Sequence, residues 1–248
     1  MRHLRTSDIA KAVGAHPNTV RLYEEWGLLP PIPRSPSGYR LFTERHRDQM
    51  RLAWTALHSN LPARPLVTSV VRTAARGDLG GALELAYAYL ARVRSERAQA
   101  EAAVEFLEHW AAGQATDTGM PARRIGEVAQ HLGVTVDMLR NWDRNGLLDV
   151  PRDPANGYRM YGPDEIGRVR VIRMLRLAGY SIMAILRMLR HFDQGGGSNL
   201  RQVLDTPRPD EDVYSVADRW LSTLDEAEQR ALEVIAQLEA MIARASTR

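Results

Sequence analysis

The chain has 248 residues, of which 44% are hydrophobic and 25% are charged, so it is long enough for one or two domains with packed cores. It contains no cysteine, which excludes disulfides, thiolate metal sites and cysteine nucleophiles. No apolar run approaches the roughly 18 residues that a membrane span needs. The N-terminal residues also lack the apolar core of a signal peptide. We therefore expect a soluble, cytoplasmic protein that does not associate with a membrane.

Positive charge is concentrated in two separate blocks, although the formal net charge is only +3. Residues 1–60 carry 9 Lys/Arg against 5 Asp/Glu, and residues 120–195 carry 12 against 8. The counts are 6 against 7 in residues 61–119 and 6 against 10 in residues 196–248. Two basic blocks are the distribution that a nucleic-acid backbone attracts, although uneven charge alone is also common in soluble proteins.

The chain repeats itself at a spacing of 119 residues. Residues 5–42 align with residues 124–161 without a gap, and ten of the 38 positions are identical. Several identities fall at glycines, and three form a Gly-Tyr-Arg sequence that ends at Arg40 in the first copy and Arg159 in the second. Because the basic blocks have the same period, we interpret the repeat as two copies of one structural unit.

Each copy is predicted to begin with two short helices joined by a glycine turn. In the first copy, residues 9–13 have the apolar spacing of a short buried helix face, and Gly14 ends that helix. A second helix begins near Pro17 and ends at Gly27. The second copy has the same pattern, with Thr135 as an N-cap candidate. Such a pair is a helix-turn-helix, whose second helix can lie in the major groove of DNA.

A β-hairpin wing is predicted to follow each pair of helices. Ser37-Gly38 and Asn156-Gly157 are turn sequences, and each precedes a strand that contains an aromatic residue. Tyr39-Arg40 and Tyr158-Arg159 then place a hydroxyl and a guanidinium beside an exposed turn, where they can contact phosphates. A single Gly-Tyr-Arg is more often an ordinary turn, but two copies behind two helix-turn-helix patterns favour the DNA-binding interpretation.

These residues resemble the MerR family of winged-helix transcriptional regulators. The segments that carry the resemblance in the first copy are Ile9-Ala10, Gly14, Thr19–Glu24, Gly27–Pro30 and Gly38–Phe42. In the second copy they are Ile125–Ala129, Gly133-Val134, Leu139-Arg140, Gly146–Leu148, Gly157–Tyr161, Asp164–Ile166, Arg168–Ile172, Leu175, Leu177–Ser181 and Ile185. The resemblance implies a mainly α fold with two winged helix-turn-helix domains, each followed by a long coiled-coil-type helix.

The resemblance also implies which side chains contact DNA. The candidate contacts on the recognition helices and wings are Asn18, Thr19, Arg21, Tyr23, Tyr39 and Arg40 in the first copy, and Asp137, Arg140, Asn141, Trp142, Arg144, Tyr158 and Arg159 in the second. Trp142 stands where the family usually has tyrosine. The first copy departs from the family pattern after Phe42, because Asn60–Pro65 replaces the glycine turn found at Gly179–Ser181. Its second helix pair is therefore expected to be altered.

Heptad-like seams predict a long helix after each copy. Their members are Leu83, Ala86, Leu90, Val93, Arg97, Ala100, Val104, Leu107 and Ala111, and then Ala217, Trp220, Leu224, Ala227, Ala231, Val234, Leu238, Met241 and Ala245. Family members dimerise through an antiparallel pair of such helices, although packing of each helix on its own domain remains an alternative. The first helix ends near Ala112 and the second unit begins at Arg123, a link that reaches at most about 35 Å. We therefore favour a single-chain pseudo-dimer over a homodimer.

The expected domains are residues 1–75, 80–112, 123–194 and 213–246, separated by linkers at 113–122 and 195–212. The second linker contains a Gly-Gly-Gly-Ser sequence after Asp193 and lacks the lysine of a phosphate loop. The histidines show no metal-ligand spacing, and no motif in the chain predicts a cofactor or a catalytic site. Aromatic residues near Trp54, Tyr87, Tyr89 and Trp110 could line a ligand pocket, but their partly helical spacing favours a packed core.

The sequence thus predicts a non-enzymatic transcriptional regulator. We expect it to bind double-stranded promoter DNA through two non-identical units and to distort that DNA, with RNA polymerase as a possible partner. Two alternatives stay open. One is an architectural DNA-binding protein, and the other is a protein–protein regulator in which one or both units no longer bind DNA. The sequence identifies neither an operator nor an effector ligand, and it does not distinguish activation from repression.

Overall fold

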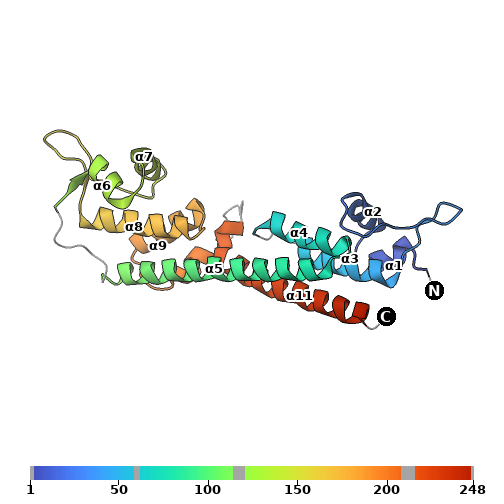
Figure 1. The fold of residues 1–248 in the computed structure, drawn as a ribbon. Helices are drawn as coiled ribbons and strands as arrows, with labels where there is room; N and C mark the ends of the chain where they lie inside the picture. The colour runs from blue at the N-terminus through green and yellow to red at the C-terminus, as the bar shows by residue number, and fades with distance from the viewer. Residues whose placement is uncertain (1–2, 59–61, 114–120, 208–215, 247–248) are drawn as a thin grey trace. The chain divides into compact units, whose positions relative to one another are not determined.

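A computed structural model describes residues 3–58, 62–113, 121–207 and 216–246, which are mainly helical (Figure 1). The chain divides into two compact units, unit 1 (Met1–Ser95 and Leu224–Arg248) and unit 2 (Glu96–Thr223). The elements are α1 (Thr6–Lys11), α2 (Pro17–Glu25), α3 (Glu44–Leu57), α4 (Arg64–Ala75), α5 (Leu79–Ala111), β1 (Arg123–Arg124), α6 (Ile125–Leu132), α7 (Val136–Arg144), β2 (Met160–Tyr161), α8 (Pro163–Leu177), α9 (Ile182–Asp193), α10 (Leu200–Asp205), η1 (Val216–Arg219) and α11 (Trp220–Ser246).

Unit 1 contains the first helix-turn-helix, formed by α1 and α2. Gly14 lies in the turn at φ +67°, a left-handed conformation that glycine adopts without a steric penalty. His16 caps α2 by accepting the Asn18 N–H through Nδ1 at 3.2 Å, and Pro17 occupies the first turn, where no intrahelical donor is needed. The buried side chains of Ile9 and other apolar residues hold the two helices together.

Unit 2 repeats this arrangement with α6 and α7. Gly133 caps α6 in the left-handed conformation, and Thr135 Oγ1 accepts the Met138 N–H at 3.1 Å as the N-cap of α7. The short strand β1 pairs with β2 in antiparallel register, with Arg123 opposite Tyr161. In unit 1 the corresponding contact is an isolated antiparallel bridge between residues 4 and 42.

Each wing contains one isolated antiparallel β-bridge. The two wings differ in the position of one residue, which is extra before the wing in one copy and extra inside the wing in the other. Leu41 N–H donates to Pro33 O in the first wing, whereas Met160 N–H donates to Pro151 O in the second. The acceptors are 118 residues apart and the donors 119. The first copy therefore has one more residue before its wing and one fewer in the wing turn. The gapless sequence alignment is wrong over this stretch, because the insertion and the deletion cancel.

The structural repeat continues beyond the point where the sequences diverge. In unit 1, Gln49 Nε2 of α3 donates to Leu28 O at 3.0 Å, and in unit 2 Arg168 Nε of α8 donates to Leu147 O at 2.7 Å. Donors and acceptors in both pairs are 119 residues apart. The helix that follows each wing thus keeps its register, although its sequence changes. The turn before α4 does differ, with Ala63 at φ +55°, while residues 59–61 lie outside the described part.

The long helices bury most of both predicted seams. In unit 1, Tyr87 Oη donates to Glu239 Oε1 at 3.1 Å and Arg94 Nε to Glu228 Oε1 at 2.8 Å, so α5 and α11 run antiparallel there (Figure 1). The C-terminal part of α11 also contacts α3, through Arg230 Nη1 to Thr55 O at 3.3 Å. The buried seam members are Ala86, Leu90, Val93, Ala100, Val104, Leu107, Trp220, Leu224, Ala227, Ala231, Val234, Leu238 and Met241.

The expected linker at 195–212 contains a helix. Within it, α10 packs against α9, and buried Arg187 of α9 donates to Val203 O at 2.7 Å and Leu204 O at 2.8 Å. Residues 208–215 and most of the other expected linker, 114–120, lie outside the described residues. Among the described residues, none of the helices combines the length and apolarity of a membrane span.

Candidate nucleic-acid interface

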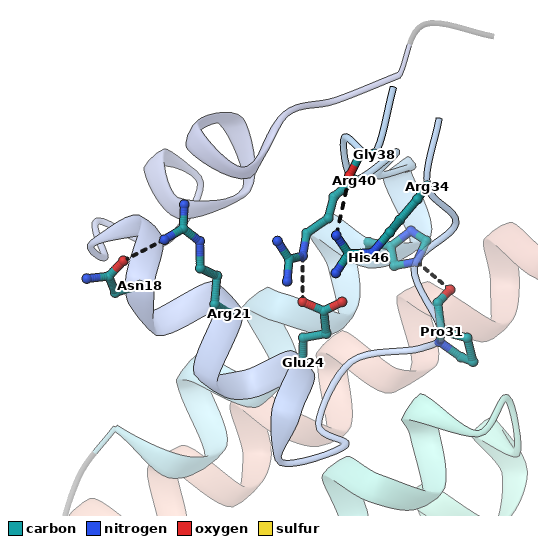
Figure 2. Close-up of polar contacts among 8 residues, drawn as sticks. All are labelled: Asn18, Arg21, Glu24, Pro31, Arg34, Gly38, Arg40 and His46. Carbon is teal, nitrogen blue, oxygen red and sulfur yellow. Dashed lines mark hydrogen bonds and ion pairs between the residues drawn. The ribbon is translucent and has the colours of Figure 1, made fainter. Parts of the chain in front are cut away.

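Equivalent polar pairs lie on the exposed faces of α2 and α7. Arg21 Nη1 donates to Asn18 Oδ1 at 3.2 Å (Figure 2), and Arg140 Nη1 donates to Asp137 Oδ1 at 3.2 Å. All four side chains are exposed, and the residues of the two pairs are 119 positions apart. Each recognition helix therefore presents a guanidinium beside an oxygen acceptor. The acceptor is neutral in unit 1 and charged in unit 2, so the two surfaces differ electrostatically.

Tyr23 and Trp142 lie on the inner faces of the same helices. Only 6% of Tyr23 and 4% of Trp142 are exposed, and burial raises the pKa of the Tyr23 hydroxyl. The family resemblance of the sequence placed both residues among the candidate DNA contacts. Their positions favour a supporting role instead, in which the aromatic ring fixes the recognition helix on the core beneath it.

The remaining candidates on the recognition helices differ in exposure. Thr19 is half-buried in α2, whereas Asn141 and Arg144 are exposed on α7. Asn145 Nδ2 donates to Asn141 O at 2.8 Å, which closes the last turn of α7. The second copy therefore presents two further polar side chains toward the end of its recognition helix.

The wing tyrosines are strongly exposed. Tyr39 is 75% and Tyr158 is 59% exposed, and each follows a left-handed glycine at the wing turn. In unit 2, the Arg124 guanidinium carbon lies 5.3 Å from the centre of the Tyr158 ring. Arg124, in β1 just before α6, thus lies against the wing aromatic, while 59% of Tyr158 stays exposed to a partner.

Each wing arginine is tied to the recognition helix of its own unit. Arg40 Nε lies 2.6 Å from Glu24 Oε2 (Figure 2), and Arg159 forms the equivalent ion pair with Asp143. These pairs are half-buried, so solvent screens them less than a surface pair. Sequence reasoning assigned both arginines to DNA contact and missed their carboxylate partners. The signal was available, because positions 24 and 143 are both acidic.

A second arginine braces the tip of each wing. Arg34 Nη1 donates to Gly38 O at 3.3 Å (Figure 2), and Arg152 Nη1 donates to Gly157 O at 3.0 Å. Sequence reasoning missed this pair because the residues are 118 positions apart, one fewer than the repeat. The wings therefore present an ordered basic surface rather than a loose turn. Among the described residues, no cluster of His, Asp or Glu has the composition of a metal site.

Comparison with known proteins agrees with this geometry. The protein-family model described as MerR family regulatory protein matches residues 5–42. A second family model, described as MerR HTH family regulatory protein, matches residues 123–191. Nodulation protein NolA of Bradyrhizobium sp. (strain NC92) is 42% identical over 66 residues, which are 27% of this chain and 28% of that protein. The mercuric resistance operon regulatory proteins of Bacillus cereus and Serratia marcescens are 32% and 36% identical, over 29% and 27% of this chain and 54% and 46% of their own lengths.

The similarity to these curated relatives is confined to part of each protein, since the chain spans between 28% and 54% of the length of those named. No solved structure matches the chain. Two separate family matches coincide with the two helix-turn-helix regions, one in each unit. Both helix-turn-helix regions of the chain, residues 5–42 and residues 123–191, therefore match the MerR family of helix-turn-helix regulatory proteins.

Proposed function

We propose that this chain is a transcriptional regulator that binds promoter DNA through both winged units. The observation that carries the proposal is the repetition of one polar arrangement at a spacing of 119 residues. Arg21 and Arg140 project from the recognition helices, while Arg40 and Arg159 join each wing to its helix. The two units differ in most of their residues, yet both keep an exposed arginine on the recognition helix and an ion pair between the wing and that helix. This repetition favours a shared function.

Each polar group has a defined part in this proposal. Arginine on a recognition helix can donate two hydrogen bonds to guanine in the major groove. The exposed wing tyrosines, Tyr39 and Tyr158, contact the phosphate backbone and fix the register. The proposed base and backbone contacts on the recognition helices are Asn18, Thr19, Arg21, Asp137, Arg140, Asn141 and Arg144. Tyr23, Trp142 and the wing ion pairs hold these side chains in position.

The two recognition surfaces are expected to read different bases. Asn18 in unit 1 stands where unit 2 has Asp137, and an amide and a carboxylate have different hydrogen-bonding capacities. One chain then recognises an unsymmetrical site, in which DNA distortion between the half-sites contributes to the binding energy. RNA polymerase acting on the distorted promoter is the partner that this proposal implies.

We further propose that the functional form is a single-chain pseudo-dimer. Support comes from unit 1, where α11 packs antiparallel to α5 and also contacts α3 through Arg230 and Gln237. A helix that follows the second winged unit in sequence therefore completes the packing of the unit that contains the first. Covalent connection makes this association independent of protein concentration.

Selection from random double-stranded DNA tests the function, combined with the molar mass of the complex by light scattering. The expected result is a motif with two unlike half-sites, bound by one chain of 27.9 kDa. A palindromic motif bound by two chains would refute the pseudo-dimer, and the absence of any enriched motif would refute sequence-specific binding. Transcription from a promoter carrying the selected site then separates a regulator from an architectural protein.

A further inference from the structure

The C-terminal ends of α11 and α5 contact equivalent positions of α3 and α8, but the side chains that make the two contacts differ in type. In unit 1, Arg244 Nη2 of α11 lies 3.3 Å from Asp48 Oδ2 of α3. In unit 2, Trp110 of α5 lies over Gly167 of α8, the position 119 residues after Asp48, and a methyl group built on Gly167 would be 2.7 Å from the indole Nε1. An ion pair in one unit is therefore replaced by an aromatic ring over glycine in the other.

A cavity of about 400 Å³ lies beside Trp110, entirely within unit 2. One wall is aromatic, because the rings of Trp110 and Phe192 have centroids 4.7 Å apart and planes inclined by 38°. Both rings are half-buried, so they are partly accessible from the cavity. The residues that complete the lining are Ala111, Gly113, Leu148, Asp149, Asp164, Glu165 and Arg168.

The polar side of this cavity has an excess of negative charge. Asp149 and Asp164 are exposed carboxylates, whereas the charge of Arg168 is already engaged. Arg168 donates to both carboxylate oxygens of Asp193, at 2.6 and 2.8 Å, and to a backbone carbonyl. Glu165 accepts the N–H of residue 162 at the start of α8. The exposed carboxylates of Asp149 and Asp164 would repel a DNA phosphate, which disfavours this surface as part of the DNA interface.

We propose that the cavity is a binding site for a small organic cation, such as an aromatic or quaternary ammonium compound. A cation placed against the Trp110 face is attracted by the electron density of the indole, and the carboxylates beside it supply complementary charge. The volume lies within the range of small-molecule sites. The replacement of the ion pair by Trp110 and Gly167 opens the aromatic wall that such a ligand requires.

The corresponding region of unit 1 has the opposite character and serves as an internal comparison. There the end of α11 borders a cavity of about 530 Å³, whose charged lining residues are the arginines Arg45, Arg47, Arg51, Arg76 and Arg244 and the carboxylates Glu44 and Asp48. Position 45 corresponds to Asp164 in the repeat, so an arginine stands where unit 2 has a carboxylate. Arginines outnumber carboxylates in the charged lining of this cavity, so it disfavours a cation, and we expect one cation site for each chain.

The test is isothermal titration calorimetry of the full chain without DNA, with benzyltrimethylammonium as the probe. Benzenesulfonate, an aromatic anion of similar size, is the charge-reversed comparison. We expect saturable binding of the ammonium probe at one site, with benzenesulfonate at least tenfold weaker. Trp110→Ala is expected to weaken binding of the cation about tenfold. Trp26→Ala, which removes an exposed tryptophan of unit 1, should leave the affinity unchanged.

A second variant keeps the test decisive if Trp110→Ala fails to fold. Asp149→Asn removes one exposed carboxylate from the lining, and it should weaken cation binding about threefold. Glu226→Gln, on the exposed surface of α11, is its matched control. Absence of saturable heat with the wild-type chain, equal binding of the anion, or unchanged affinity in Asp149→Asn would each overturn the proposal.

Discussion

Arg40 donates through Nε to Glu24 at 2.6 Å and thereby joins the first wing to the recognition helix. Three-quarters of each side chain is shielded from solvent, unlike the pair formed by Arg140 and Asp137, whose side chains are 59% and 90% exposed. The two ion pairs therefore provide a direct comparison between a half-buried ion pair and an exposed one. Their different environments lead to the first prediction.

A double-mutant cycle between Arg40→Met and Glu24→Gln should give a coupling free energy of about 1 kcal/mol in urea unfolding. The same cycle between Arg140→Met and Asp137→Asn should give no measurable coupling, because water screens both charges. A coupling in the first cycle that is no larger than in the second would show that the partial burial of the wing pair does not strengthen it. Raising the salt concentration should reduce the first coupling only slightly.

Loss of one recognition arginine should relax sequence preference in one half-site. Arg21→Ala and Arg140→Ala are each expected to cost about 1–3 kcal/mol of base discrimination, at different positions of the selected DNA site. Fluorescence anisotropy with single-base variants of that site measures the effect. Arg94→Ala removes the same charge from α5 and should leave the base preference unchanged. If both recognition variants lost preference at the same base, the two-unit interpretation would be wrong.

Alanine at Gly179 should destabilise the protein far more than alanine at Gly195. Both glycines have positive φ, but a methyl group at Gly179 would also lie 2.6 Å from Trp220 Nε1. That indole is held in place by a 2.7 Å hydrogen bond to Ala178 O, whereas nothing lies within 4 Å of a methyl group at Gly195. We expect losses of about 3 and about 1 kcal/mol in the free energy of unfolding. Equal losses would show that backbone strain alone decides the cost.

Arg187 is predicted to be essential for the packing of α10. It is 4% exposed, and its Nη2 also donates to Asp218 O at 3.0 Å, in addition to the α10 carbonyls. Arg187→Met should lower the free energy of unfolding by about 3 kcal/mol, because buried carbonyl groups lose their donors. Arg190→Met, one turn later and exposed, should cost less than about 0.5 kcal/mol. Chemical denaturation of the full chain distinguishes the two variants.

Burial of His46 should make unit 1 less stable in mild acid. Burial lowers the pKa of His46 below its ordinary value of 6.5, so the unfolded chain binds the proton more readily than the folded one. This contribution to stability is fully present above about pH 6.5 and is lost as the pH falls toward the lowered pKa. In the folded state His46 Nδ1 accepts the Thr43 N–H at 3.1 Å, and protonation would remove that acceptor.

His46→Gln should therefore flatten the loss of stability between about pH 7 and pH 5. His109→Gln, at an exposed position of α5, should retain the pH dependence of the parent chain. Thermal unfolding over a pH series gives the comparison. A slope that is unchanged in His46→Gln would assign the acid sensitivity to other groups.

Local signals predicted the helical units well because they act over a few residues. Thr135 caps α7 through its own hydroxyl, and the apolar seams of both long helices are largely buried. The sequence could not show whether Tyr23 contacts DNA or packs beneath the recognition helix, since tyrosine, with an apolar ring and a polar hydroxyl, occurs on either face of a helix. Nor could it detect the shifted wing turn, because two opposite changes in length left the overall spacing at 119.

Contacts between residues that are distant in the sequence also could not be predicted. Arg187 fixes α10 within a stretch that composition marks as flexible, and its acceptors are backbone carbonyls, which carry no sequence signature. The cavity beside Trp110 depends in the same way on Gly167, whose lack of a side chain admits the indole. The partly helical spacing around Trp110 favoured a packed core over a ligand pocket, whereas Trp110 lines a cavity.

The division of α11 between the units has a consequence for synthesis on the ribosome. Unit 1 contains both the first residues of the chain and Leu224–Arg248, whereas unit 2 is one continuous stretch, Glu96–Thr223. Domains usually fold in the order in which they are translated. Here the segment that emerges first must wait for the last helix, and the later segment can finish folding before it. A stalled or truncated product would therefore expose the apolar faces of α3 and α5, and would be an early target for proteolysis.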